Sequence, residues 1–455
     1  MSTRRVVVVG GGLAGLRAAL TLADAGAEVT LLEGRRRLGG LTWSLRRNGL
    51  SFDNGQHVFL RCCTAYRQFL DRLGATDGVH LQRRLDIPVL SPRGGVCSSI
   101  TRSSLPAPLH LGPALARYTH LGRADRLRLA RAALALRHLD PDDPALDTIT
   151  FGRWLSRHGQ GDRAIERLWD LIALPSLNLP ASQASLALAV KVFRTGLLDR
   201  ADAGDVGWST APLGELHGDH AAQALSRARV QTVLGARVQA ISHQDNGGFA
   251  VLADQRRYAA DAVVVATPPE VAQEIVPTGV LPPGIGLGQS PIVNVHLVLD
   301  RPVTDLPLAA VLDSPIQFLF DRTASSGARS GQCLSISLSA ADSFIAQPST
   351  ELIRTFFTAL GDLHPTARTA RLLDGVVTRE RAATFRGIPG TASRRPSCRT
   401  RVPGLFLAGA WCDTGWPATM EGAVRSGLSA ASACLELAEP PRVSEHRRTL
   451  EKVAR

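Results

Sequence analysis

Two glycine-rich segments near opposite ends of the 455-residue chain constrain its fold more than any other feature. The first, Val6–Gly15, places glycines directly after a β-branched, apolar run. Such a run is typical of a buried parallel strand, and the glycines that follow it are typical of a tight turn into a helix. The second, Gly404–Gly427, predicts another buried strand, a tryptophan-bearing loop and a second helix. We expect both segments to close on one extended ligand.

The first segment has the parts of a dinucleotide site. Three of its glycines, Gly10, Gly12 and Gly15, allow a tight turn and close approach of the backbone to a pyrophosphate at a helix N-terminus. A second predicted strand, Glu28–Glu33, ends in an acid about as far along the chain as a ribose-binding carboxylate is expected. The agreement of strand, helix, second strand and acid predicts dinucleotide binding.

The residues after Glu33 indicate which dinucleotide is bound. The run Gly34–Gly40 contains three arginines and ends in a glycine pair. The arginines would suit the 2′-phosphate of NADP, but Glu33 would repel that phosphate and the C-terminal segment would have no role. The glycine pair resembles that of the flavoprotein amine oxidase and carotenoid desaturase superfamily. Together with the C-terminal closing segment, this resemblance favours a flavin dinucleotide, FAD.

Composition limits the other classes of partner. The net charge is +12, and Lys191 and Lys452 are the only lysines. This arginine excess is explained by a GC-rich genome, and it is also compatible with attraction to anionic lipid head groups. Because the charge is scattered and no basic module with interleaved aromatic residues is present, we expect no nucleic-acid binding.

Cysteines and hydropathy predict the compartment. The seven cysteines form no Cys-x-x-Cys pair and no even framework, which favours reduced thiols in the cytoplasm. The first predicted strand begins almost at Met1, so no signal peptide is expected, and no long uncharged apolar run predicts a transmembrane helix. No spacing of ligands predicts a metal site.

The pattern along the chain predicts an α/β protein with a Rossmann-like FAD-binding domain and an inserted α+β substrate domain. Residues 103–200 have helical period, with leucine and alanine on one face and arginine on the other, most clearly over Arg123–Leu139. This region is interpreted either as an ordinary helical cap or as an amphipathic cover that touches the bilayer. The expected boundaries are 1–90, 217–285 and 400–437 for the FAD-binding domain, 91–216 and 286–399 for the substrate domain, and 438–455 for a tail.

Four motifs carry a resemblance to a known family. They are Asp53–His57, Leu177–Pro180, Ser290–His296 and above all Asp413–Gly427. With them the chain resembles, over nearly its whole length, the squalene-associated FAD-dependent desaturases of the flavoprotein amine oxidase and phytoene desaturase superfamily. The resemblance implies a glutathione-reductase-like fold of amine oxidase type and reduction of hydroxysqualene to squalene in hopanoid biosynthesis. It also implies an isoprenoid lipid substrate, earlier squalene-pathway enzymes as partners, and peripheral association with the inner membrane.

The family pattern also implies which residues contact FAD. In this pattern the first motifs contact the pyrophosphate and the ribose, and the backbone of one strand, at Val238, contacts the adenine. The later motifs contact the isoalloxazine. The implied set is Gly10, Gly12, Ala14, Gly15, Glu33, Gly34, Arg35, Gly39, Gly40, Gly55, Gln56, His57, Val238, Gly409, Trp416, Pro417, Ala418 and Met420. The helix that begins near Met420 is expected to point its positive end at the flavin N1 and C2 carbonyl.

Two positions depart from the family pattern. Ala410 stands where the superfamily usually has an acid that contacts the ribityl chain, and no substitute for it is evident in the sequence. Leu41 stands where an arginine is often found near the phosphates, and the arginines at 35–37 are candidates to replace it. Both departures are expected to affect the affinity for FAD rather than its identity.

Removal of an allylic hydroxyl requires an acid, exclusion of water and a nearby hydride donor. His57 is the first candidate for the acid, because its motif is expected beside the flavin and histidine titrates near neutral pH. Asp53, Asp413 and Glu421 are alternatives, although Asp53 could instead fix its loop and Glu421 could cap a helix. Trp416 could stabilise a cation through its π face or pack against the flavin.

Two other functions remain open at this point. One is an oxidative enzyme of the same fold, either a carotenoid-type desaturase or an amine oxidase, although an aromatic content of only 5% argues against an aromatic cage for an amine. The other is a non-catalytic carrier of isoprenoid lipids, which would not need Glu33 or the flavin loop.

Overall fold

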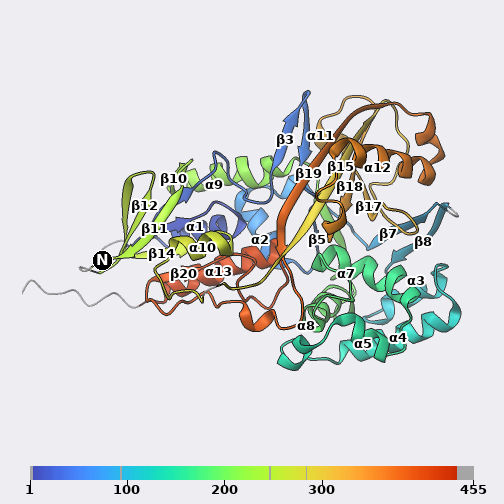
Figure 1. The fold of residues 1–455 in the computed structure, drawn as a ribbon, viewed down its shortest axis with the longest axis horizontal. Helices are drawn as coiled ribbons and strands as arrows, with labels where there is room; N and C mark the ends of the chain where they lie inside the picture. The colour runs from blue at the N-terminus through green and yellow to red at the C-terminus, as the bar shows by residue number, and fades with distance from the viewer. Residues whose placement is uncertain (1–3, 93–94, 245–246, 283, 438–455) are drawn as a thin grey trace, which may run out of the picture.

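The structure, a computed structural model, describes residues 4–92, 95–244, 247–282 and 284–437. The molecule is elongated, with a parallel sheet and its helices in one half and a large mixed sheet beside a group of helices in the other (Figure 1). Among the described residues no helix is long and apolar enough to cross a membrane, and no group of side chains is suited to hold a metal ion.

The parallel sheet is assembled from three separate parts of the chain. Its strand order is β10-β2-β1-β14-β20. The bounds are Gln231–Leu234 for β10, Glu28–Glu33 for β2, Arg5–Val9 for β1, Ala262–Val265 for β14 and Leu405–Leu407 for β20. Strand β1 pairs with β2 on one side and β14 on the other, and its four valines are buried. Continuous apolar strands suit a sheet that is covered on both faces.

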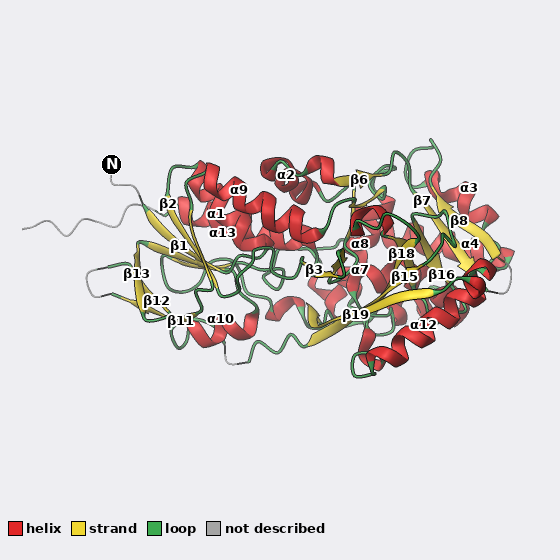
Figure 2. Cartoon of the chain, turned by 90° about the horizontal axis from the view of Figure 1, so that it is seen from above, coloured by secondary structure: helices red, strands yellow, loops and turns green. Residues whose placement is uncertain are grey.

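Helices cover one face of this sheet and a small antiparallel sheet covers the other (Figure 2). The first layer holds α1 (Leu13–Asp24), α9 (His220–Arg227) and α13 (Met420–Leu435). The second holds β11 (Val238–His243), β12 (Phe249–Ala253), β13 (Arg256–Ala260) and α10 (Pro269–Ile275). Helices α1 and α13 touch at Gly427, where an added Cβ would lie 2.1 Å from the Ala14 carbonyl oxygen. The two glycine-rich segments are therefore in direct contact, as their pattern predicts.

The second half contains a seven-stranded sheet of order β19-β15-β18-β17-β16-β7-β8. The bounds are Leu372–Phe385, Gln289–Leu299, Gln332–Leu338, Phe318–Asp321, Leu308–Val311, Asp86–Ser91 and Gly95–Thr101, in that order. Helix α12 (Ser349–Leu363) packs on β15 and β19. Strand β7 crosses the boundary expected at residue 90, because it pairs with β16 of this sheet.

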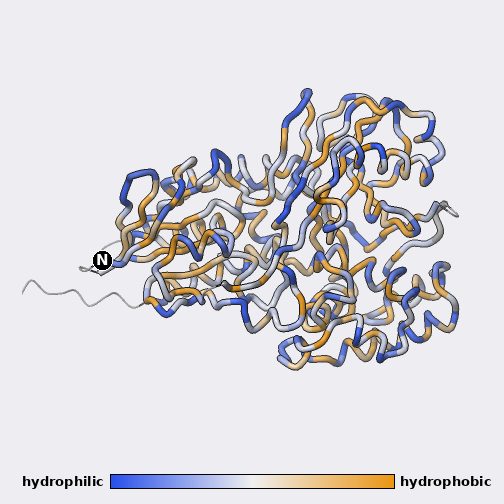
Figure 3. The backbone as a smooth tube through the Cα atoms, viewed as in Figure 1, coloured by the Kyte–Doolittle hydropathy of each residue, from blue (hydrophilic) through white to orange (hydrophobic). Residues whose placement is uncertain are grey.

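A group of helices lies beside this sheet. Its members are α3 (Gly112–Arg117), α4 (Arg123–Arg137), α5 (Phe151–Arg157), α6 (Asp162–Ala164), α7 (Asp170–Leu177) and α8 (Leu186–Phe193). Rings of Phe151, Trp154, Trp169 and Phe193 pack together inside the group. Hydrophobic residues alternate with hydrophilic ones along its helices, whereas the strands of the parallel sheet are more uniformly hydrophobic (Figure 3). The helical group thus contributes to the core as well as to the surface.

Smaller elements join the halves. They are the hairpin β3 (Ser44–Arg47) and β4 (Leu50–Asp53), the sheet β5 (Val58–Leu60), β9 (Val206–Ser209) and β6 (Val79–Leu81), and helices α2 (Thr64–Leu73) and α11 (Thr323–Ser326). Three π-helical turns occupy Ile165–Trp169, Arg194–Leu198 and Glu215–Asp219. Short 3-10 turns lie at Thr76–Gly78, Leu109–Leu111, Pro144–Thr148, Ala341–Ser343, Pro365–Thr369 and Ala392–Arg394.

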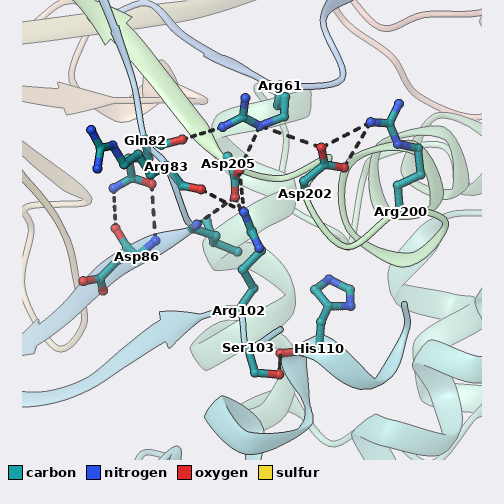
Figure 4. A network of polar contacts seen from close by, with 11 residues as sticks. Arg61, Gln82, Arg83, Asp86, Arg102, Ser103, His110, Arg200, Asp202 and Asp205 are labelled. Atoms are coloured by element: carbon teal, nitrogen blue, oxygen red, sulfur yellow. Dashed lines mark hydrogen bonds and ion pairs between the residues drawn. The ribbon is translucent and has the colours of Figure 1, made fainter. Parts of the chain in front are cut away.

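A buried carboxylate ties these joining elements to strands β7 and β8 of the large sheet (Figure 4). The Asp205 side chain is fully buried and accepts from Arg61 Nε at 2.8 Å and Arg102 Nε at 2.6 Å. It also accepts from the backbone N–H of Leu85 at 2.8 Å. Burial opposes ionisation, but hydrogen bonds from Arg102 and Arg61 hold the pKa of Asp205 below its ordinary value. The two arginines thus neutralise a buried carboxylate and stabilise the contact between these elements.

Candidate FAD site

The glycine-rich turn leaves the N-terminus of α1 open for a phosphate. Gly12 is the N-cap, no side chain caps the helix, and its first turn contains no acid. A Cβ added at Gly12 would meet only Gly40 Cα, at 3.7 Å, so the space in front of the helix is free of side chains. Free N–H groups and the positive end of a helix dipole form a site for an anion. The observed turn therefore fits the pyrophosphate of a dinucleotide.

Glu33 lies where the ribose is expected. Its Oε2 accepts from the Gly11 N–H at 2.6 Å and its Oε1 from the Arg35 N–H at 2.7 Å. Each carboxylate oxygen can accept a second hydrogen bond, so two backbone contacts fix the carboxylate and leave it able to bind hydroxyl groups. The strand that carries Val238 begins close by, since the Ala236 N–H donates to the Glu33 carbonyl at 2.9 Å.

The arginines after Glu33 converge on the glycine pair. Arg35 Nη1 and Arg37 Nη1 donate to the Gly40 carbonyl at 3.3 and 2.9 Å. Because Gly40 lies against Gly12, two guanidinium groups stand near the expected phosphates, while the Leu41 side chain is 41% exposed. Arg35 and Arg37 can thus supply the positive charge that Leu41 does not.

Strand β15 of the large sheet fixes the Asp53–His57 loop. Asn294 donates to the Asn54 carbonyl at 3.2 Å and accepts from the Gln56 N–H at 3.3 Å. His296 Nε2 donates to the Asp53 carbonyl at 3.0 Å. The backbone of the loop is thereby held against the substrate half, while the side-chain Nε2 of Gln56 is buried without a partner in the described residues. An unpaired donor at this point suits a ligand that supplies an acceptor.

Asp53 itself is used for structure. Its carboxylate forms a buried ion pair with Arg322 at 2.7 Å and accepts from Ser44 Oγ at 2.7 Å and from the Leu213 N–H at 2.9 Å. Both oxygens are bound to structural partners, one of them in a buried ion pair, and only 6% of the residue is exposed. This geometry favours the loop-fixing interpretation over the catalytic one.

His57 is partly buried and its ring orientation is set by the loop. Nδ1 lies 3.0 Å from the Gly55 carbonyl, and a carbonyl only accepts, so Nδ1 carries the proton. In the neutral ring Nε2 is then an acceptor. Burial lowers the pKa of His57 below its ordinary value, although the Gly55 carbonyl and Asp53 oppose this effect. A neutral His57 can orient a hydroxyl group, whereas donation from Nε2 requires a second proton that burial disfavours.

The C-terminal loop, Trp416–Met420, places an indole between two cations. Lys191 Nζ lies 5.5 Å from the centre of the Trp416 ring and the Arg425 guanidinium 5.0 Å from it. Thr419 caps α13 by accepting from the Gly422 N–H at 3.1 Å. Thr419 thus takes the Gly422 N–H, and the two N–H groups before it in α13 are left for the flavin pyrimidine that is expected there.

Neighbouring residues hold this C-terminal segment in place. Ser426 Oγ accepts from the Gly409 N–H at 2.8 Å. Arg395, buried, donates to the Ala410 carbonyl at 3.2 Å and, at a shorter distance, to that of Cys412. Burial raises the pKa of the Cys412 thiol well above its ordinary value, which fits packing rather than reactivity.

Two of the acid candidates have structural roles. Glu421 is 1% exposed and accepts from the N–H groups of Ala65 and Tyr66 at 3.2 and 2.7 Å, so it caps α2 rather than its own helix. Its third partner is Arg425 Nε at 2.6 Å. Asp413 is exposed and accepts from the Gly415 N–H at 3.2 Å within its own loop. Glu421 is thus bound on both oxygens by structural partners, and Asp413 accepts within its own exposed loop.

The Leu177–Pro180 motif also has a structural explanation. Asn178 ends α7 in the left-handed conformation and donates to the Ser290 carbonyl at 3.0 Å, and Ser290 Oγ donates back to the Asn178 carbonyl at 2.7 Å. Strand β15 therefore binds two of the other motifs, Leu177–Pro180 at Ser290 and Asp53–His57 at Asn294 and His296.

Sequence reasoning did not identify several residues that build the site. Asn294 and His296 stand within a quoted motif, but their contacts with a distant loop have no local signal. Arg322 and Arg395 are hidden among many surface arginines. Lys191 did carry a signal, because lysine is almost absent from this chain.

The family comparison agrees with this geometry. The model of the flavin-containing amine oxidoreductases matches residues 13–435. The hydroxysqualene dehydroxylase of Zymomonas mobilis is 27% identical, over 94% of this chain and 98% of the relative. That of Rhodopseudomonas palustris is 29% identical, over 95% and 99%. A probable zeta-carotene desaturase of Synechococcus elongatus is 26% identical, over 95% and 98%.

Solved structures show the same fold. A putative protoporphyrinogen oxidase from Exiguobacterium superposes with a TM-score of 0.71 at 20% identity, over 96% of this chain and 100% of the other. Cyclohexylamine oxidase from Brevibacterium oxydans superposes with a TM-score of 0.70 at 21% identity, over 96% and 99%. The prediction of a Rossmann-like fold of amine oxidase type is confirmed, and so is FAD as the cofactor.

Proposed function

The chain belongs to the flavin-containing amine oxidoreductase family, and we propose that its reaction is the reductive dehydroxylation of hydroxysqualene to squalene. The observation that carries this proposal is the similarity to hydroxysqualene dehydroxylases over almost the full length of both chains. The coarser assignment, an FAD-dependent oxidoreductase, follows from the family. Family membership also argues against a non-catalytic lipid carrier.

The residues of the site have separable roles in this proposal. Reduced FAD, when bound between the glycine-rich turn and Trp416, supplies the hydride. Gly12, Glu33, Arg35 and Arg37 hold its phosphate and ribose end. Gln56 binds an acceptor of the ligand with its unpaired Nε2, and His57 accepts the hydrogen of the substrate hydroxyl at Nε2 and so orients the C–O bond.

The test is anaerobic incubation of the purified protein with hydroxysqualene and chemically reduced FAD, with squalene measured by mass spectrometry. We expect stoichiometric squalene and oxidised FAD. His57→Ala should keep FAD and lose about 10²-fold in turnover, the lower end of the range for a positioned group that contacts the reacting proton. Absence of squalene from the wild-type reaction would contradict the dehydroxylase proposal.

A second candidate, carotenoid desaturation, is favoured by the similarity to zeta-carotene desaturases over nearly the same length. It runs in the opposite redox direction, so it needs oxidised FAD and a polyene substrate. Incubation of the oxidised holoenzyme with phytoene or zeta-carotene, followed by absorption spectroscopy of the product, distinguishes the two. A longer conjugated chromophore would favour the desaturase.

We further propose that the helical group rests on the anionic inner membrane, where a triterpene substrate dissolves. One face of α4 presents Arg123, Leu127, Arg131 and Leu134 to solvent, and Leu127 is 64% exposed. Leu109, 60% exposed, lies in the turn that precedes α3, which itself packs on α4. Apolar side chains between arginines are typical of a surface that binds anionic lipid.

A further inference from the structure

Lys191 is the feature of the site that the proposed function leaves unused. It lies on α8 in the helical half, and its ammonium reaches the Trp416 ring on the FAD-binding half, at 5.5 Å from the ring centre. A π-helical turn, Arg194–Leu198, begins three residues later. Single π turns within helices occur often at functional sites. Figure 1 shows α8 where the helical group meets the half that contains α13.

The residue type at this position is informative. Of 52 lysine and arginine residues only two are lysines, and the second, Lys452, lies outside the described residues. A positive charge alone would be met by arginine, and the other cation on the same indole is indeed Arg425. Lysine differs from arginine because its ammonium can release a proton, whereas a guanidinium remains charged in proteins.

The charges around the indole are also unequal. Arg425 is neutralised by Glu421, whose carboxylate lies 2.6 Å from Arg425 Nε. In the part of the chain that the structure describes, Lys191 has no carboxylate partner and no side-chain hydrogen bond acceptor. Its three N–H donors are therefore available to a group that is not part of the protein.

His57 is poorly suited to the role of acid in this geometry, because donation from Nε2 requires a second proton that burial disfavours. Its Nδ1 proton is directed to the Gly55 carbonyl, so the neutral ring has no proton at Nε2 to give. Asp53 and Glu421 are buried, and each carboxylate accepts from the backbone and from an arginine. The remaining candidate, Asp413, is exposed and its side chain accepts within its own loop, so the predicted set offers no well-placed proton donor for the leaving hydroxyl.

We propose that Lys191 is the proton donor of the dehydroxylation, an inference that rests on the proposed function. The Lys191 ammonium gives a proton to the substrate hydroxyl while the C–O bond breaks, and water leaves. The carbon accepts the hydride and forms a C–H bond, so the substrate is reduced and the cofactor oxidised. The remaining proton of the reduced cofactor returns to the amine, and the balance is R–OH + FADH₂ → R–H + H₂O + FAD.

The experiment compares Lys191→Met, Lys191→Arg and Lys191→Ala with the wild-type holoenzyme in the anaerobic assay. All three should bind FAD with unchanged Kd and midpoint potential and lose about 10²–10⁴-fold in kcat with little change in KM. Arg354→Met, which removes an exposed cation on α12, is the matched control and should behave as wild type. Ethylamine should restore part of the activity of Lys191→Ala, and guanidine should not.

The outcomes separate the possible roles of Lys191. Near wild-type turnover in Lys191→Arg would show that only the charge matters and would overturn the proposal, as would normal turnover in Lys191→Met. A shifted potential or weaker FAD binding, without amine rescue, would place the ammonium on the cofactor instead. If Lys191→Met fails to fold, the turnover of Lys191→Arg and the amine rescue of Lys191→Ala still test the proposal. Failure of the wild-type enzyme to form squalene would reject the proposed function, and the role of Lys191 with it.

Discussion

Replacement of Glu421 by glutamine separates a structural carboxylate from a catalytic one. Glu421 Oε1 accepts from the Ala65 N–H and from Arg425 Nε, and Oε2 accepts from the Tyr66 N–H. The single oxygen of glutamine will take the Oε1 place, because two donors meet there. The NH₂ group of the new glutamine then faces the Tyr66 N–H. Both of these groups are donors, and both are left buried without an acceptor.

The magnitude follows from these contacts. An unsatisfied buried donor costs about 1–3 kcal/mol, and two donors face each other here, so we expect a loss of about 3 kcal/mol in the free energy of unfolding. This is a large part of the about 5–15 kcal/mol that stabilises a typical protein. Because α2 and α13 are held together through Glu421, the loss should appear in the holoprotein as well.

Urea unfolding followed by tryptophan fluorescence measures this loss, with turnover measured on protein that is still folded. Asp413→Asn is the control, since that exposed residue bonds only its own loop, and it should change the free energy of unfolding by less than about 0.5 kcal/mol. An unfolding midpoint equal to that of wild type, together with lost turnover in Glu421→Gln, would refute the structural role and return Glu421 to the acid candidates.

Three further predictions concern the cofactor, pH and the membrane. Glu33→Arg should weaken FAD binding and lower the thermal midpoint through the lost ligand linkage; unchanged FAD occupancy would place the ribose contact elsewhere. Burial raises the pKa of Asp170 to about 6, above its ordinary value, so the folded state favours the protonated form and stability falls as pH rises from about 4 to 6. Asp170→Asn should flatten this pH dependence and raise stability at pH 8 by about 1–2 kcal/mol in urea unfolding, since the group is only partly buried; an unchanged profile would exclude Asp170 as its source. The double variant Leu127→Glu/Leu134→Glu should abolish co-sedimentation with anionic liposomes at low salt, and equal binding to neutral vesicles would argue against the arginine-based contact.

The nucleotide-binding strands were predictable because their signals are local. A β-branched run, a glycine turn and an acid follow one another within Val6–Glu33, and each strand is buried on both faces, so its periodicity is simple. The helix predicted over Arg123–Leu139 is observed as Arg123–Arg137 for the same reason. The sequence also predicts a helix over Ala221–Arg229 and a buried strand within Asp261–Pro269, and the structure has α9 at His220–Arg227 and β14 at Ala262–Val265.

The large sheet was only partly predictable. Strand β19, Leu372–Phe385, is long but lies at an edge of the sheet. It contains Gly375 and the charged run Arg379–Arg381, and buried and exposed residues do not strictly alternate along it. Strands β7 and β8 join the sheet through a parallel pairing with β16, a contact between distant segments. Such pairings depend on tertiary packing, which a local pattern does not contain.

The same limit applied to the acid candidates. His57, Asp53, Asp413 and Glu421 were selected by residue type and nearness to a motif, and both properties are shared by structural carboxylates. The deciding information is the number of partners, which is a property of the fold. Asp53 and Glu421 each have three partners, including an arginine, and neither partner set was visible in the sequence.

Counting partners also identifies what remains for a ligand. Gln56 Nε2 has no partner among the described residues, and the Nδ1 contact leaves His57 Nε2 as an acceptor. Within the same residues, Lys191 Nζ has no hydrogen bond or ion pair and lies over the Trp416 ring. These groups come from the loop that β15 fixes and from the helix that faces Trp416. A donor, an acceptor and an ammonium are the groups needed to hold a cofactor carbonyl, to orient a hydroxyl and to protonate it. The buried and unpaired Gln56 Nε2 is costly unless a ligand completes it, and His57 Nε2 and the half-buried Lys191 ammonium are open to the same ligand. We therefore infer that reactivity resides in these three residues rather than in the buried carboxylates.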